Sequence, residues 1–150
     1  MSTIYNFCQV SDTLACSGQP TEEQLKELAA EKYTIVNLAM ANTKYSLPDE
    51  AASAKALGMD YYHIPVVFDN PQIEELEDFI TWMNQRTDNK VIVHCVANYR
   101  ASVFTGLYLF AIDKLNEDET RLFIEEIWQP DAIWEQFLDE SLEYIRRSKT

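Results

Sequence analysis

The chain has 150 residues, of which 47% are hydrophobic and 25% charged, with three glycines and five prolines. This composition indicates one globular domain over residues 1–150 and excludes a disordered chain. The formal net charge of −13 excludes nucleic acid as a partner and disfavours an anionic membrane surface. No apolar run approaches the roughly 18 residues that span a bilayer. The amino terminus lacks a secretory pattern, which favours the cytoplasm; a periplasmic location stays open if a signal peptide has been removed.

The first half of the chain alternates short apolar runs with amphipathic stretches. It predicts strands over residues 7–10, 14–17, 33–39 and 59–66 and helices over residues 21–31, 48–57 and 72–86. The first two strands pair across a turn at Ser11 and Asp12. A capping-box pattern opens the first helix, and Asn70 before Pro71 predicts the N-cap of the third.

The second half continues the alternation and then becomes helical. It predicts a strand over residues 91–95 and helices over residues 101–115, 116–128 and 131–147. The helix over 101–115 is apolar nearly all round, so it is expected at the centre of the core. The pattern predicts an α/β fold: a mostly parallel, twisted sheet covered by helices on both faces, with a small amino-terminal strand pair and a helical carboxyl terminus. Ligands of such sheets bind at the carboxyl ends of the strands.

Three cysteines is an odd number, and their spacing is not that of a metal site, so no metal or cofactor is expected. With a two-residue turn, Cys8 faces Ala15, which puts Cys8 and Cys16 on opposite faces of the strand pair and disfavours a disulfide. A different register would bring the two thiols together. We therefore interpret both as structural thiols.

The sequence KVIVHCVANYRAS, residues 90–102, has the pattern of an anion-binding loop that holds a thiolate. Cys95 ends a buried strand, and backbone N–H groups of the loop together with the start of the next helix favour its thiolate. Arg100 offers a planar fork for two oxygens of a tetrahedral anion, and Asn98 tolerates a positive φ in mid-loop. The remaining loop positions are Val96, Ala97, Tyr99, Ala101 and Ser102. The alternative is a buried strand-end thiol beside a surface arginine.

This loop resembles the His-Cys-x5-Arg-Ser/Thr loop of cysteine-dependent protein tyrosine and dual-specificity phosphatases. Residues 63–79 resemble the general-acid region of the dual-specificity enzymes, and residues 17–38, which begin SGQP, resemble the opening of the bacterial beta-lactamase-hydrolase-like family, described as phosphatases of unknown function. The resemblance implies a phosphatase-like three-layer fold. It also implies Cys95 as nucleophile, Arg100 as phosphate clamp, Asp69 as general acid, and His94 as a support of the loop.

The loop also departs from the phosphatase pattern. Four residues separate Cys95 from Arg100 instead of five, Asn98 stands where glycine is usual, and Ala101 replaces a hydroxyl that Ser102 supplies only if the loop is realigned. A Cys-x4-Arg spacing is similar to that of rhodanese sulfurtransferases, whose loop cradles a persulfide.

Three functional classes therefore stay open. The first is a slow phosphomonoesterase that forms a cysteinyl-phosphate from a phosphorylated small molecule or phosphoprotein. The second is a sulfurtransferase that works through a cysteine persulfide. The third is a catalytically weak module that binds phosphate or sulfate. The sequence indicates neither the substrate nor the oligomeric state.

Overall fold

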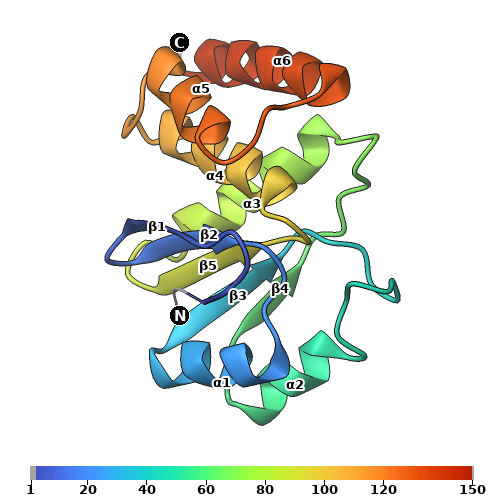
Figure 1. The fold of residues 1–150 in the computed structure, drawn as a ribbon. Coiled ribbons are helices and arrows are strands. Elements are labelled where there is room, and N and C mark those ends of the chain that lie inside the picture. The colour runs from blue at the N-terminus through green and yellow to red at the C-terminus, as the bar shows by residue number, and fades with distance from the viewer. Residues whose placement is uncertain (1–2, 150) are drawn as a thin grey trace.

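A five-stranded sheet lies between two groups of helices in the computed structural model, which describes residues 3–149 (Figure 1). The strands are β1 (Cys8–Ser11), β2 (Leu14–Ser17), β3 (Tyr33–Asn37), β4 (Tyr61–His63) and β5 (Lys90–His94). The helices are α1 (Glu22–Ala30), α2 (Glu50–Ala56), α3 (Ile73–Asn84), α4 (Tyr99–Ala111), α5 (Glu117–Glu125) and α6 (Ala132–Ser148). Helices α1 and α2 cover one face of the sheet, and α3 to α6 lie on the other side.

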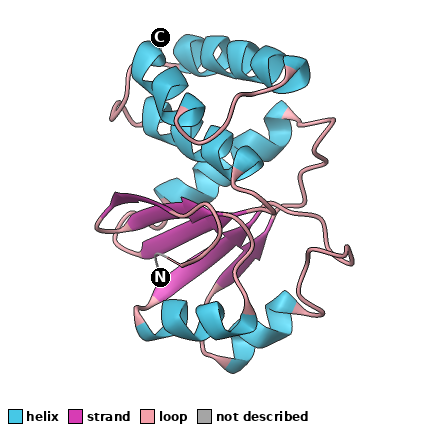
Figure 2. Ribbon diagram, viewed as in Figure 1, coloured by secondary structure: helices cyan, strands magenta, loops and turns pink. Residues whose placement is uncertain are grey.

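The strand order is β1-β2-β5-β3-β4, with β1 antiparallel to β2 and every other neighbouring pair parallel (Figure 2). The predicted class, a mostly parallel α/β sheet with helices on both faces, is confirmed. Strand β5 lies in the middle, between β2 and β3, so its carboxyl end is enclosed on both sides. No helix within residues 3–149 is both long and apolar enough to cross a membrane.

Helix α4 occupies the centre of the larger core, as its apolar sequence predicts. Phe104 of α4 packs against Phe79 of α3 and against Trp134 and Phe137 of α6. The smaller core, under α1, brings Leu25 and Leu28 against strand residues that include Ile35 and Ile92. These two cores fix both faces of the central strand, and hence the position of the loop that follows it.

The register of the amino-terminal strand pair differs from the prediction. Cys8 is opposite Cys16, and Gln9 is opposite Ala15. Ser11 pairs with Leu14, so the turn lies at residues 12–13, and an irregularity between Gln9 and Ser11 then shifts the remaining pairs by one residue. The expectation that Cys8 faces Ala15 is therefore wrong, although both thiols are free.

The start of α3 also differs from the prediction. Gln72 is the N-cap residue: its N–H donates to Glu75 Oε1 at 2.9 Å, as in one half of a capping box, and its carbonyl accepts from the Glu75 N–H at 3.1 Å. Asn70 instead closes the preceding turn, where its N–H donates to the Val67 carbonyl at 3.0 Å. Its side-chain oxygen accepts from Gln72 Nε2 at 2.9 Å. The expected N-cap at Asn70 is wrong because the hydrogen bonds between Gln72 and Glu75, further along the chain, mark the start of the helix.

Candidate active site

Cys95 lies directly after β5, at the carboxyl edge of the sheet. Its N–H donates to the Ser17 carbonyl of β2 at 3.3 Å, so the neighbouring strand fixes the start of the loop. Asn98 then has φ 69° and ψ 16°, the left-handed conformation in which asparagine is one of the better-tolerated residues. This turn reverses the chain into α4, and the loop from Cys95 to Arg100 wraps around the strand end.

The sulfur of Cys95 faces the beginning of α4. The Ala101 N–H points to Sγ at a distance of 3.5 Å, and the Cys95 residue is only 1% exposed. The first N–H groups of a helix have no partner within the helix, and the helix dipole places partial positive charge there. The loop therefore offers donors and positive potential to a thiolate or a bound anion.

Arg100 is buried, so the interpretation of it as a surface charge is wrong. It is 6% exposed, and its Nη1 donates to the Val66 carbonyl at 2.8 Å. The guanidinium carbon lies 5.7 Å from the centre of the Phe68 ring. Among the residues that the structure describes, Nε has no partner. Arg100 thus holds the segment after β4 against the cysteine loop, while its buried Nε is left without a partner within residues 3–149.

A cavity of about 460 Å³ opens over this loop. It is lined by Cys95, Val96, Ala97, Tyr99 and Arg100 from the loop and helix, together with Met40, Thr43, Lys44, Tyr45 and Phe68. The sequence-predicted residues Asp69, His94, Asn98, Ala101 and Ser102 lie outside this lining. Asp69 follows Phe68 in an exposed turn, so the expected general acid does not line the cavity.

Sequence reasoning missed the cavity wall formed by residues 40–45. They belong to the long connection between β3 and α2, which leaves the same edge of the sheet as the cysteine loop. Tyr45 is 56% exposed, and the Lys44 ammonium lies 5.0 Å from the centre of its ring. The sequence did contain a signal for this wall, because the connection follows the carboxyl end of the buried strand β3, where ligands of such sheets bind.

The amino-terminal segment fastens the outer side of the loop. Asn6 Nδ2 donates to the Ala97 carbonyl at 2.9 Å, and Asn98 Nδ2 donates back to the Asn6 carbonyl at 2.9 Å. The same Asn98 amide also points to Cys16 Sγ at 3.5 Å. These contacts stabilise the positive φ of Asn98, and the role of Asn6 was not predicted from the sequence.

An aromatic group forms the side of the loop next to α5 and α6. Tyr99 stacks on Trp128, with 4.4 Å between ring centres and 7° between planes, and Phe68 packs against both. Ser102 is buried within this group. Its hydroxyl donates to the Tyr99 carbonyl at 2.7 Å and accepts from Trp128 Nε1 at 3.0 Å. The geometry assigns that hydroxyl to the support of Tyr99.

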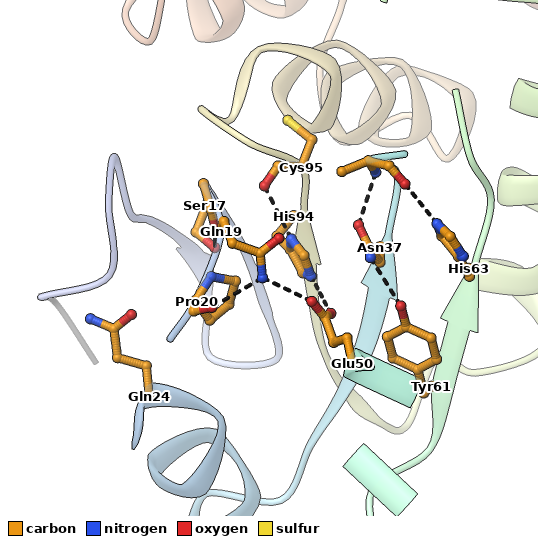
Figure 3. Close-up of polar contacts among 12 residues, drawn as sticks. Ser17, Gln19, Pro20, Gln24, Asn37, Glu50, Tyr61, His63, His94 and Cys95 are labelled. Carbon is orange, nitrogen blue, oxygen red and sulfur yellow. Dashed lines mark hydrogen bonds and ion pairs between the residues drawn. The ribbon is translucent and has the colours of Figure 1, made fainter. Parts of the chain in front are cut away.

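Behind the cysteine, His94 contacts a buried carboxylate (Figure 3). His94 Nε2 lies 2.6 Å from Glu50 Oε2, and His94 Nδ1 lies 3.1 Å from the Cys95 carbonyl oxygen. Gln19 Nε2 donates to the second oxygen of Glu50 at 2.8 Å. Burial alone would raise the pKa of Glu50, but His94 and Gln19 more than offset it, and the pKa is lowered. The sequence analysis did not predict a role for Glu50. It indicated Gln19 only through the SGQP motif, residues 17–20, in which Gln19 stands.

Three comparisons with known proteins were informative to different degrees, and the solved structures gave the matches. A scan against protein-family models gives no match, and a search of curated proteins gives none. Among solved structures, a putative phosphatase (DUF442) from Shewanella putrefaciens CN-32 is 33% identical, with a TM-score of 0.86 over 96% of this chain and 95% of that one.

Two further solved structures resemble this fold. Tk-PTP in its active form is 23% identical, with a TM-score of 0.76 over 95% of this chain and 97% of its own. PTPMT1, in complex with PI(5)P, is 12% identical, with a TM-score of 0.80 over 96% of this chain and 99% of its own.

A buried strand that ends in a cysteine loop, followed by the central helix, is the fold that this chain shares with these phosphatase structures. The family follows from the Shewanella putrefaciens structure, which is 33% identical to this chain over 96% of this chain and 95% of its own. The chain belongs to the DUF442 phosphatase family. The family resemblance inferred from the sequence is confirmed.

Proposed function

We propose that the protein is a cysteine-dependent phosphomonoesterase, in which Cys95 attacks phosphorus and forms a cysteinyl-phosphate. The observation that carries the proposal is the cavity that Cys95 and Arg100 line together, with the Ala101 N–H directed at Sγ. Membership of the DUF442 family supports the same chemistry. Arg100 and the N–H groups at the start of α4 bind the phosphoryl oxygens, and positioning with charge stabilisation supplies most of phosphoryl-transfer catalysis.

The cavity wall favours a phosphate carried on a flat or extended group. Three aromatic side chains, Tyr45, Phe68 and Tyr99, line the cavity, and Lys44 adds a positive charge to its lining. Aromatic rings pack well on a planar leaving group. A phosphorylated small molecule or a phosphoprotein side chain is the proposed substrate.

Asp69 is the proposed general acid. It lies in the turn next to Phe68, which lines the cavity, and it is exposed. To protonate the leaving oxygen, its carboxyl group has to come within hydrogen-bond distance of that oxygen. Such proton transfer typically contributes about 10²–10⁴-fold. The role therefore matters most for poor leaving groups and least for nitrophenol.

The test is hydrolysis of nitrophenyl phosphate. We expect slow turnover by the native protein, none by Cys95→Ser, and unchanged turnover by Cys8→Ser, since Cys8 lies outside the cavity. Asp69→Asn is expected to slow an alkyl phosphate far more than nitrophenyl phosphate. Turnover that survives Cys95→Ser, or native protein that fails to turn over either ester, contradicts the proposal.

The short loop makes sulfur transfer the second candidate. With four residues between Cys95 and Arg100, the loop has one N–H fewer than the phosphatase pattern. One missing donor can cost about 10²–10³-fold in rate. Insertion of a glycine after Asn98 is therefore expected to raise phosphatase activity. Cys95-dependent transfer from thiosulfate to cyanide by the native protein, lost on insertion, would instead establish the sulfurtransferase. Binding of phosphate without turnover in either assay would leave an anion-binding module.

A further inference from the structure

His94 is enclosed by hydrogen-bond acceptors on both sides of its ring. The Cys95 carbonyl oxygen can only accept, so Nδ1 carries a hydrogen. On the other side, Nε2 faces a Glu50 oxygen at 2.6 Å. The other Glu50 oxygen accepts from Gln19 Nε2 at 2.8 Å, which stabilises the carboxylate form, and a carboxylate oxygen at 2.6 Å requires a hydrogen on Nε2. Both ring nitrogens then donate, which is the imidazolium form.

The buried pair meets the conditions under which a charge pair tolerates burial. Both residues are nearly inaccessible, with His94 0% and Glu50 6% exposed. Desolvation of two charges is compensated only when geometry is good and the remaining polar atoms are satisfied. Here the second carboxylate oxygen accepts from Gln19, and the second imidazole nitrogen donates to Cys95.

Gln19 is itself held rigidly by the backbone. Its N–H donates to the Val96 carbonyl at 2.9 Å, and its side-chain amide donates to the Pro20 carbonyl at 3.0 Å as well as to Glu50. The SGQP motif therefore connects the cysteine loop to the carboxylate by two separate hydrogen bonds. Sequence-based reasoning left this motif without a role.

We infer that Glu50 and Gln19 are positioning residues that hold His94 as an imidazolium behind Cys95, and that this ion pair, with its positive end next to Cys95, stabilises the Cys95 thiolate. The inference rests on the proposed function, because it concerns the same nucleophile. Figure 3 shows the arrangement: the His94 ring points to Glu50, while the Cys95 sulfur points to the other side. The charge acts from behind the loop, opposite the cavity in which Arg100 acts.

Other charged and titratable groups surround this pair, and the experiment has to separate them. Facing Glu50 are His63 and Tyr61 of β4 and Asp49 at the start of α2; facing Cys95 are Arg100 of α4 and Cys16 of β2. His63 Nε2 lies 2.6 Å from the Ala39 carbonyl, so its ring is directed away from His94. A cavity of about 350 Å³ reaches Glu50, which gives the carboxylate a route to solvent.

Glu50→Gln changes the charge with little change in shape. The amide can donate to a neutral His94 and accept from Gln19, so both hydrogen bonds survive and only the ion pair is lost. Glu22→Gln is the matched control. It removes the same charge from an exposed carboxylate that accepts from Ser53 of α2 at 3.1 Å.

The first measurement is the alkylation rate of Cys95 by iodoacetamide against pH, made in a Cys8→Ser background. We expect Glu50→Gln to move the midpoint upward by about one pH unit, a tenfold loss of thiolate below the midpoint, and Glu22→Gln to leave it in place. A residue with a merely structural role would lower stability without moving the midpoint. An unchanged midpoint in folded Glu50→Gln overturns the inference.

The second measurement needs no variant at Glu50. The chain has two histidines, so a His63→Gln protein identifies the His94 ring nitrogens in a ¹⁵N NMR spectrum. Two protonated nitrogens at pH 7 support the inference, and one protonated nitrogen overturns it. Both measurements are independent of turnover. If the midpoint shifts but no phosphate ester is hydrolysed, the positioning role stands and the phosphatase proposal fails.

Discussion

Cys8 and Cys16 face each other across β1 and β2, and their thiols differ in acidity. A hydrogen bond from Cys16 lowers the pKa of Cys8 from 9.0 to about 7, against the opposing effects of burial and Glu126. The same contact raises the pKa of Cys16, and burial raises it further. The lowered pKa predicts a reactive thiol at Cys8, at a place where the sequence indicated only a structural one.

We expect iodoacetamide to modify Cys8 with a rate that rises through about pH 7, because the thiolate reacts and the donor from Cys16 stabilises it. Cys16→Ala removes that donor, so the midpoint of the Cys8 profile should move up towards 9.0. Peptide mass spectrometry measures each site. Inorganic phosphate should protect Cys95 but leave Cys8 unaffected. A Cys8 profile that is identical in Cys16→Ala would refute the assigned cause.

At the level of elements, the connection between β2 and α1 is packed directly against the cysteine loop. A Cβ atom on Gly18 would lie 2.6 Å from the Val96 carbonyl oxygen and 2.7 Å from Cδ2 of Tyr5. Residue 18 also forms an isolated antiparallel bridge with Ala97. Glycine is required here because two pieces of backbone approach each other closely.

Gly18→Ala should therefore destabilise the protein by about 1–3 kcal/mol and displace the cysteine loop. Gly58→Ala is a suitable comparison: Gly58 has φ +74° with nothing within 4 Å of the added atom, so strain of about 1–2 kcal/mol is expected without contact to the loop. Urea unfolding gives the free energies, and alkylation of Cys95 reports on the loop. Equal alkylation of the two variants would show that Gly18 does not position the loop.

The elements themselves were largely predictable, because hydrophobic periodicity and capping patterns act locally. The capping box at Thr21 and Gln24 and the buried strand β5 follow directly from the sequence. The bulge that sets Cys8 opposite Cys16 was not predictable, since it depends on a turn whose residues fit more than one geometry. Glu50 was not predictable either. Its partner His94 is distant in the chain, and an acidic residue at the start of a helix has a sufficient local explanation.

At the scale of the whole molecule, the protein has a net charge of −13, although the proposed ligand of its site is itself an anion. Arg100 and Lys44 supply local positive charge at the cavity, but the field at a distance is negative. The protein should therefore select among phosphorylated partners by the charge that surrounds the phosphate.

A single domain over residues 1–150 stays a prediction.

We expect phosphopeptides flanked by lysine to be hydrolysed with a kcat/KM on the order of 10-fold above that of peptides flanked by glutamate at low salt. Raising the ionic strength from about 0.01 M to about 0.15 M shortens the Debye length from about 30 Å to about 8 Å, so this preference should shrink. Initial rates at several salt concentrations measure it. A preference that is independent of salt would place its origin in direct contacts at the rim.

The position of β5 in the sheet also bears on how the protein folds. Residues 14–17 of β2 pair with residues 91–94 of β5, and β3 pairs with β5 on the other side. Contacts between segments so distant in the chain form slowly, because loop closure costs entropy before the contacts compensate it. The loop that holds Cys95 can take its shape only after both pairings exist. In a chain that is still folding, Cys95 therefore lies in an unorganised segment, and its loop takes shape only late in the process.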